Sequence, residues 1–150
     1  MKTLFRKTDN WIEPLRKFSN FALCPLFDLG VRVYLGHEFW KSGVLRFKDW
    51  QNGNFDNQVF LFELEHPVPG LDPTVAAYLT TGAELVLPVL LVLGLFGRFA
   101  AAGLLAMTAV IEFTYGHFDV HILWAFLAGM IFLKGPGKIS LDTLILKWIR

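Results

Sequence analysis

The stretch from Thr74 to Gly97 constrains the fold of this chain most, because it is an almost uninterrupted apolar run. It reads TVAAYLTTGAELVLPVLLVLGLFG, and Glu84 is its single charged residue. At 1.5 Å of rise per residue, a helix of this length crosses a hydrocarbon core that is roughly 30 Å thick. The run therefore predicts a transmembrane helix that carries a carboxylate near its middle.

The composition of the whole chain also indicates a membrane protein. Hydrophobic residues make up 54% of the 150 residues and charged residues only 18%, whereas soluble domains carry about 25% charged residues. A net charge of +1 without a basic cluster gives no electrostatic footprint for nucleic acid. The single cysteine, Cys24, excludes an intramolecular disulfide and dithiol redox chemistry.

Further apolar segments complete a predicted all-α integral membrane protein with four transmembrane helices in one domain. Phe99 to Tyr115 follows the first run after a tight turn at Arg98, which predicts an antiparallel hairpin, and Val120 to Leu133 is a shorter span. The expected segments are a basic interfacial segment at 1–17, helices at 18–47, 73–97, 98–116 and 118–134, an outer loop at 48–72, and a C-terminal amphipathic helix at 139–150.

The placement of lysine and arginine predicts the orientation of these helices. Lys2 to Lys17 holds five of the fourteen Lys and Arg residues, whereas the segment from Asp49 to Asp72 has five acidic residues and no Lys or Arg. Because short cytoplasmic loops are enriched in Lys and Arg, both termini are expected in the cytoplasm. The N-terminus lacks the apolar core of a cleaved signal peptide, so we expect the helices themselves to direct insertion.

Ionisable residues inside the predicted spans are the first candidates for function. Each costs roughly 2.5 to 3.5 kcal/mol at membrane depth, so such groups normally face the interior of a bundle. Counted from the helix ends, Arg32 and Glu84 both lie near the middle of the membrane, and we expect them to pair. Gly36, Trp40 and Gly43 share one stripe with Arg32, and the two glycines permit close approach of a neighbouring helix. A purely structural ion pair is the alternative interpretation.

A second polar group is expected at the outer ends of the helices. His37, Glu112, His117 and His121 are candidate metal ligands there, and the spacing of four between His117 and His121 places both on one helical face. Without a Cys or Met cluster, such a site would suit zinc or copper(II) rather than copper(I). The alternative is that these histidines are interfacial and hydrogen-bond to loops.

Several motifs together resemble the DoxX family of small four-helix bacterial inner-membrane proteins. The resemblance extends from about Gly30 to Leu146, and it predicts location in the inner membrane. The motifs that carry it are the Arg32 to Gly43 stretch, Pro67-Val68-Pro69, Ala76 to Leu85, Pro88 to Leu95, Arg98, His121 to Trp124, and Gly135 to Asp142.

The resemblance implies a redox context. Founding members of the family are similar to a subunit of an archaeal membrane thiosulfate:quinone oxidoreductase, and mycobacterial members are associated with superoxide dismutase and a sulfurtransferase. We therefore expect an accessory, quinone-reactive membrane subunit in which Arg32, Glu84 and Glu112 form a buried proton-handling site, and Arg32, Glu84 and Trp124 contact the quinone. The sequence has no flavin, haem or iron-sulfur motif, so a partner redox protein or a small substrate would supply the electrons.

Two alternatives follow from other members, which are encoded beside enzymes that modify copper-binding or cysteine-rich peptides. The chain could handle copper or zinc at its outer face, or it could be a membrane scaffold that docks a peptide-modifying or detoxifying enzyme. The glycines of the first helix also permit homo-oligomers.

Overall fold

The structure is a computed structural model that describes residues 11–65, 67–116 and 118–149, and every regular element within these residues is a helix. The all-α prediction is confirmed. A helical segment at 11–18 comes first. The elements that follow are the π-helical turn η1 (Ser19–Leu23), α2 (Cys24–Gln51), α3 (Phe55–Leu64), α4 (Pro73–Leu93), α5 (Gly97–Thr114), α6 (Asp119–Lys134) and α7 (Leu141–Ile149).

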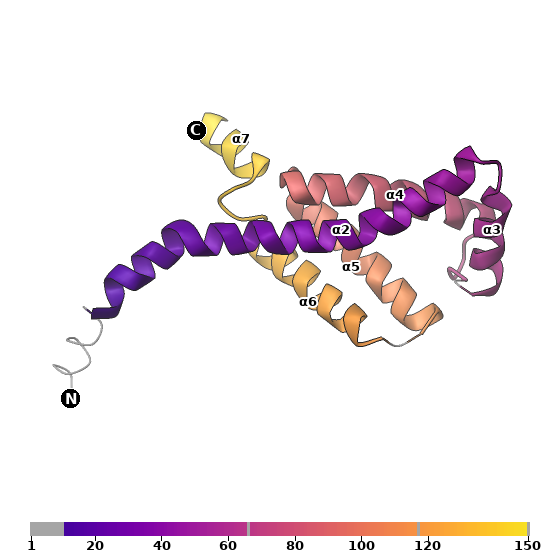
Figure 1. Ribbon diagram of the computed structural model, residues 1–150, viewed down its shortest axis with the longest axis horizontal. Coiled ribbons are helices and arrows are strands. Elements are labelled where there is room, and N and C mark those ends of the chain that lie inside the picture. Colours follow the sequence, from indigo (N-terminus) through magenta and orange to yellow (C-terminus); the bar gives the residue numbers. More distant parts are fainter. Residues whose placement is uncertain (1–10, 66, 117, 150) are drawn as a thin grey trace.

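Helix α2 is a long rod that runs through most of the length of the molecule (Figure 1). Its 28 residues correspond to roughly 42 Å, which exceeds a hydrocarbon core of about 30 Å. The predicted range of 18–47 differs from α2 at both ends, since the π-helical turn η1 precedes α2 and α2 continues to Gln51. Pro25, which has no amide hydrogen to donate to the preceding turn, lies directly after η1.

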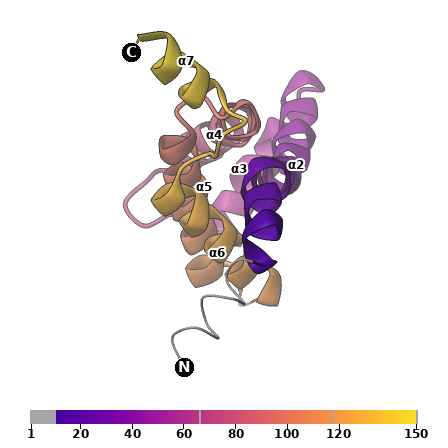
Figure 2. The ribbon, with the colours of Figure 1, turned by 90° about the vertical axis from the view of Figure 1, so that its left-hand side faces the viewer.

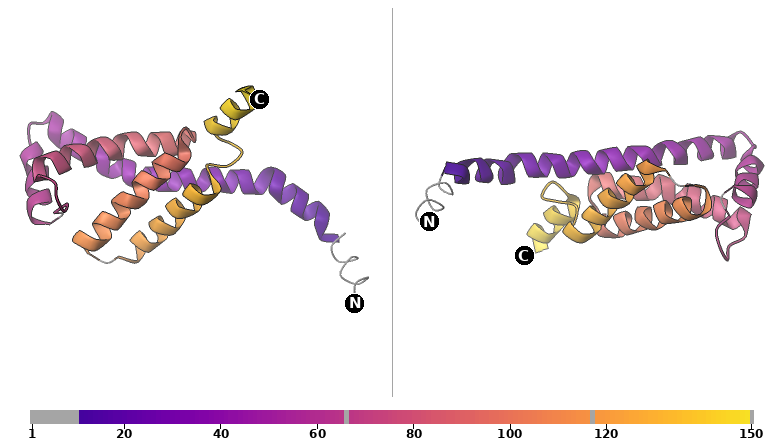
Figure 3. Two further views of the ribbon diagram at one scale, coloured as in Figure 1. Left: turned by 180° about the vertical axis from the view of Figure 1, so that it is seen from behind. Right: turned by 90° about the horizontal axis from the view of Figure 1, so that it is seen from below.

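The most extensive packing is between α2 and α4, which are separated in the sequence by α3. Helix α4 lies along α2, α5 packs against α4, and α6 returns beside α5; Figures 2 and 3 show this arrangement from three further sides. The tail end of the bundle holds the α4–α5 turn, the end of α6 and residues 135–149. The loop end, at the other side of Figure 1, holds α3 and the connection between α5 and α6.

Small residues bring the central helices close together. Ala100, Ala101 and Ala128 are fully buried with Leu91 and Leu104 in one apolar cluster. Gly43 of α2 lies so close to α4 that a Cβ atom there would be 2.9 Å from the backbone carbon of Glu84. A Cβ atom at Gly36 would likewise lie 3.3 Å from the carbonyl oxygen of Pro88. Small residues at helix interfaces allow such approach, so the prediction that the two glycines of the first helix face a neighbour is confirmed for Gly36 and Gly43.

A helix stands where an outer loop was expected at 48–72. Phe55, Val59 and Phe62 recur at helical spacing, and with this face α3 packs on Ala76 and Ala77 of α4. The segment was predicted to be a loop because it has five acidic residues and no Lys or Arg, and its helical periodicity was not used. The two ends of the segment are therefore joined by a helix with its own small core.

Two helices, α4 and α5, are long and apolar enough to cross a membrane. Helix α6 has 16 residues, and α2 carries several charged residues among its apolar ones. The four-span arrangement with both termini in the cytoplasm therefore stays a prediction. Residues 1–10 of the predicted basic segment lie outside the described residues.

We expect Gly43→Ala to lower the thermal unfolding temperature of the detergent-solubilised protein, because its Cβ would meet the backbone of Glu84 at 2.9 Å. Overpacking of this kind costs about 1 to 3 kcal/mol. Gly30→Ala, in the same helix, is the matched control because nothing lies within 4 Å of its added Cβ. Equal unfolding temperatures for the two variants would contradict the close contact.

Candidate functional site

Arg32 lies at the tail end, where its guanidinium binds main-chain carbonyls. The residue is 1% exposed. Its Nη1 donates to the carbonyl oxygens of Leu91 at 3.4 Å and Val92 at 3.0 Å, and its Nη2 donates to the carbonyl oxygen of Ile139. The last carbonyls of a helix have no partner within the helix and attract cations. Arg32 thus closes the C-terminus of α4 and ties the C-terminal tail to it.

The predicted pair between Arg32 and Glu84 is wrong. Helices α2 and α4 are antiparallel, and the residue of α2 opposite Glu84 is Gly43. Gly43 lies about three helical turns beyond Arg32, which is roughly 16 Å along the axis. The prediction estimated the depth of each residue from the ends of its own helix, and it started the first helix at residue 18, whereas α2 starts at Cys24. This placed the two charges at the same depth.

The motif from Gly135 to Asp142 also supplies hydrogen-bond partners to main-chain groups at helix ends. The Asp142 carboxylate accepts hydrogen bonds from the amides of Phe96 and Gly97, each at 2.9 Å, at the start of α5. The amide of Asp142 donates to the carbonyl of Gly94 at 3.0 Å. Gly94 has φ 65°, a conformation that glycine adopts without steric cost. The structure therefore gives this motif a role in holding the α4–α5 turn.

Glu84 pairs with Arg46, which the sequence analysis did not single out. Arg46 Nε lies 3.3 Å from Glu84 Oε2, and the two side chains are 14% and 3% exposed. The Arg46 guanidinium also lies over the ring of Phe62, 5.0 Å from its centroid. Arg46 lies three residues after Gly43 and continues the face of α2 that carries Arg32 and Gly43. Extending this spacing by one more turn predicts Arg46 as a further residue of the same face.

A cavity of about 370 Å³ lies beside this pair, between α2, α4, α5 and α6 and capped by α3. Most of its wall is apolar. Its polar or ionisable lining residues are Glu38, Ser42, Arg46, Thr80, Glu84, Thr114, Tyr115, His121 and Trp124.

Two donors of the cavity residues are buried without a hydrogen-bond partner among the described residues. They are Arg46 Nη1 on α2 and Trp124 Nε1 on α6. A buried donor without a partner costs about 1 to 3 kcal/mol, and such groups call for a functional explanation. The cavity therefore combines apolar walls with unsatisfied donors on two different helices.

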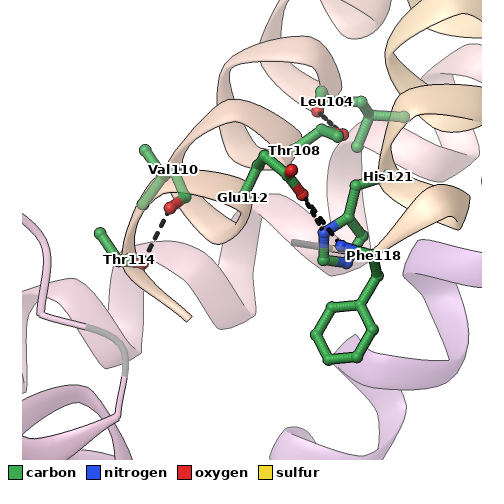
Figure 4. Close-up of polar contacts among 7 residues, drawn as sticks. All are labelled: Leu104, Thr108, Val110, Glu112, Thr114, Phe118 and His121. Carbon is green, nitrogen blue, oxygen red and sulfur yellow. Dashed lines mark hydrogen bonds and ion pairs between the residues drawn. The ribbon is translucent and has the colours of Figure 1, made fainter. Parts of the chain in front are cut away.

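His121 and Glu112 form a second polar pair, next to the cavity (Figure 4). His121 Nδ1 lies 2.8 Å from Glu112 Oε2, and the amide of Phe118 donates to the same oxygen at 3.4 Å. The histidine lines the cavity, and it also lines a groove of about 670 Å³ along α5 and α6 that Glu112 borders. Its ring packs against Trp124 at 5.4 Å between centroids. His121 thus stands between the cavity and this groove.

The structure brings together two of the four predicted metal ligands, Glu112 and His121. His37 has a side chain that is 63% exposed, and it lies 3.6 Å from Glu38. His117 lies outside the described residues. Within 11–65, 67–116 and 118–149, no three or more His, Cys, Asp or Glu side chains are grouped closely enough to hold a metal ion.

Of the residues predicted to contact a quinone, Glu84 and Trp124 line the cavity. Arg32 does not, because it lies at the other end of α2 with its three carbonyls. Trp40, predicted on the buried stripe, is 40% exposed, and Phe39 occupies the buried position with 3% exposure. The catalytic and metal-binding roles of all these residues stay predictions.

These features define a class: a small all-α membrane protein whose helices enclose a mostly apolar cavity with a few polar groups. The family model DoxX matches residues 27–117, and the chain belongs to the DoxX family. A relative from Haemophilus influenzae, described as an uncharacterized protein, is 26% identical over 129 residues, which cover 78% of this chain and 82% of the relative. No solved structure matches.

We expect Arg46 and Glu84 to be energetically coupled, and Arg32 and Glu84 to be independent. In double-mutant cycles of thermal or denaturant unfolding, Arg46→Gln with Glu84→Gln should deviate from additivity by about 0.5 kcal/mol or more, because the side chains are in contact. Arg32→Gln with Glu84→Gln should be additive within about 0.5 kcal/mol. The reverse pattern would mean that Arg32 is the partner of Glu84.

Proposed function

We propose that this chain is a redox-associated membrane subunit that binds the head group of a quinone in the cavity between Arg46 and Trp124. The observation that carries the proposal is the pair of unsatisfied buried donors on cavity residues of α2 and α6. A quinone ring presents two carbonyl oxygens on opposite edges. Donors on two helices that flank an apolar cavity suit such a ligand.

The size and chemistry of the cavity support this ligand. A volume of about 370 Å³ lies within the range of about 300 to 1,000 Å³ typical of small-molecule sites, which are mostly apolar with a few polar groups. Phe39, Phe62 and Met107 contribute apolar wall, which suits a ring with a hydrocarbon tail. The Arg46 guanidinium would stabilise negative charge that develops on one quinone oxygen.

Reduction of a quinone to a quinol takes up two electrons and two protons, one at each oxygen. Glu84 and His121 are ionisable residues of the cavity wall and are proposed as the proton donors. Glu112, whose Oε2 lies 2.8 Å from His121 Nδ1, borders the groove along α5 and α6 and would pass a proton from there to His121. The electrons would come from a partner redox protein, in agreement with the accessory role proposed here.

The proposal includes the four-span arrangement in a bacterial inner membrane, with both termini in the cytoplasm. The supporting observations are the two apolar helices α4 and α5 and the family. Helix α6 would complete its span with Lys134, whose side chain is 55% exposed and can extend toward the membrane surface. In this orientation the cavity lies in the outer half of the bundle.

We expect a short-chain ubiquinone or menaquinone analogue to bind the detergent-purified protein and to quench the fluorescence of Trp124 in the cavity wall. Arg46→Gln should weaken this binding by about tenfold, because a hydrogen bond to a charged donor contributes about 1.5 to 3 kcal/mol. Titration of the analogue against tryptophan fluorescence measures both values. The matched control is Arg32→Gln, which removes the other buried arginine, outside the cavity, and should leave the affinity unchanged.

Trp124→Phe keeps an aromatic ring in the cavity wall and removes only the donor, so it separates loss of the hydrogen bond from loss of packing. Its affinity is measured by equilibrium dialysis with the same analogue, since its fluorescence differs. Saturable binding that is equal in wild type, Arg46→Gln and Trp124→Phe would place the quinone elsewhere. Absence of saturable binding to the folded wild type would overturn the proposal.

A further inference from the structure

At the tail end, a groove of about 960 Å³ opens between the C-terminal tail and the bundle. Three cationic side chains line it, namely Arg98, Lys134 and Lys138, together with the acidic residues Asp28 and Asp142. From this groove we infer a binding site for an anionic phospholipid, which is independent of the cavity and of the function proposed for it.

The charges of the groove are not balanced. Lys134 Nζ lies 2.8 Å from Asp28 Oδ1, and both carboxylate oxygens of Asp142 accept main-chain hydrogen bonds at the start of α5. Lys138 donates to a neutral acceptor, the carbonyl oxygen of Asn20, at 2.8 Å. Neither Lys138 nor Arg98 has a carboxylate partner among the residues that the structure describes. The groove therefore offers two cations to an anion.

The rest of the groove suits an acyl chain. Apolar side chains from both sides line it, including Leu95 and Phe99 beside the turn and Ile145 and Leu146 of α7. Phe99 is 78% exposed and Leu146 is 56% exposed. Helix α7 stands away from the other helices (Figure 1) and presents further apolar residues, including Trp148 at 89% exposure. An exposed apolar wall next to cations that have no carboxylate partner among the described residues is complementary to an anionic lipid, which has an acyl chain and a charged headgroup.

With α4 and α5 as membrane spans, as proposed above, the groove lies at the level of the lipid headgroups. The two helices able to span a membrane, α4 and α5, reverse direction at residues 94–96, beside the groove. A turn between two spans lies at a membrane surface. Lys134 ends α6 at the same end of the bundle. Basic pockets between helices at this level bind anionic lipid headgroups, so the occupant we infer is an anionic glycerophospholipid of the surrounding leaflet.

The experiment is native mass spectrometry of the full chain released from nanodiscs that contain equal amounts of dioleoylphosphatidylglycerol and dioleoylphosphatidylcholine. We expect the wild type to retain the anionic lipid about tenfold more than the zwitterionic one, at about one lipid per chain. The double variant Arg98→Gln, Lys138→Gln should lose most of this preference, because it removes the two cations that would attract the anionic headgroup. Equal retention of both lipids by the wild type would overturn the inference.

The matched control is Lys41→Gln, Lys48→Gln, which removes two lysines of α2 outside the groove and should keep the wild-type preference. Thermal unfolding in detergent shows whether each variant is folded, and Arg98→Lys, Lys138→Arg, which keeps both charges, should retain the lipid. Full retention by the folded Gln double variant would place the lipid elsewhere. Release of the lipid by millimolar inorganic phosphate would show a phosphate site without lipid specificity and would also overturn the inference.

Discussion

The guanidinium of Arg32 holds the tail end of the bundle together. It joins three parts of the chain, because its donors reach the last carbonyls of α4 and the carbonyl of Ile139 in the tail. Asp142 does the opposite at the start of α5, where a carboxylate accepts from the first amides. A cation at a helix C-terminus and an anion at a helix N-terminus both act favourably on the helix dipole. The α4–α5 turn is thus held by opposite charges supplied from elsewhere in the chain.

Charge in this molecule is divided between its two ends. At the tail end, Arg32 and Asp142 bind main-chain groups, and both carboxylate oxygens of Asp142 accept main-chain hydrogen bonds. Toward the loop end, ionisable side chains pair with each other, as Arg46 with Glu84 and Glu112 with His121. Arg46, Glu84 and His121 also line the cavity. Gly43 contributes to this arrangement, because its lack of a side chain lets α2 approach Glu84 closely. The unsatisfied buried donors that belong to the cavity are therefore at the loop end, whereas Arg98 and Lys138, which have no carboxylate partner among the described residues, line the groove at the tail end.

Sequence patterns predicted the helical class, the apolar hairpin of α4 and α5, and the family. They also placed Arg32 in the interior, where it is 1% exposed. They could not predict its partners, because register between helices depends on which small residues meet, and a shift of a few residues changes every facing pair. Helix α3 and Arg46 were missed for a different reason. The helical spacing of both is present in the sequence. The acidic residues of the α3 segment led to the prediction of a loop, and Arg46 lies next to the predicted end of the first helix at residue 47.

The distance along the chain between Arg32 and Ile139 has a consequence for how the protein is made. The two residues are separated by 107 positions, so the arginine is synthesised long before its third acceptor leaves the ribosome. A buried guanidinium that lacks its acceptors is costly. Helix α2 therefore gains the last acceptor of Arg32 only after Ile139 has been added to the chain. A chain that stops before Ile139 would leave Nη2 of Arg32 without this acceptor, whereas Nη1 would keep the carbonyls of Leu91 and Val92.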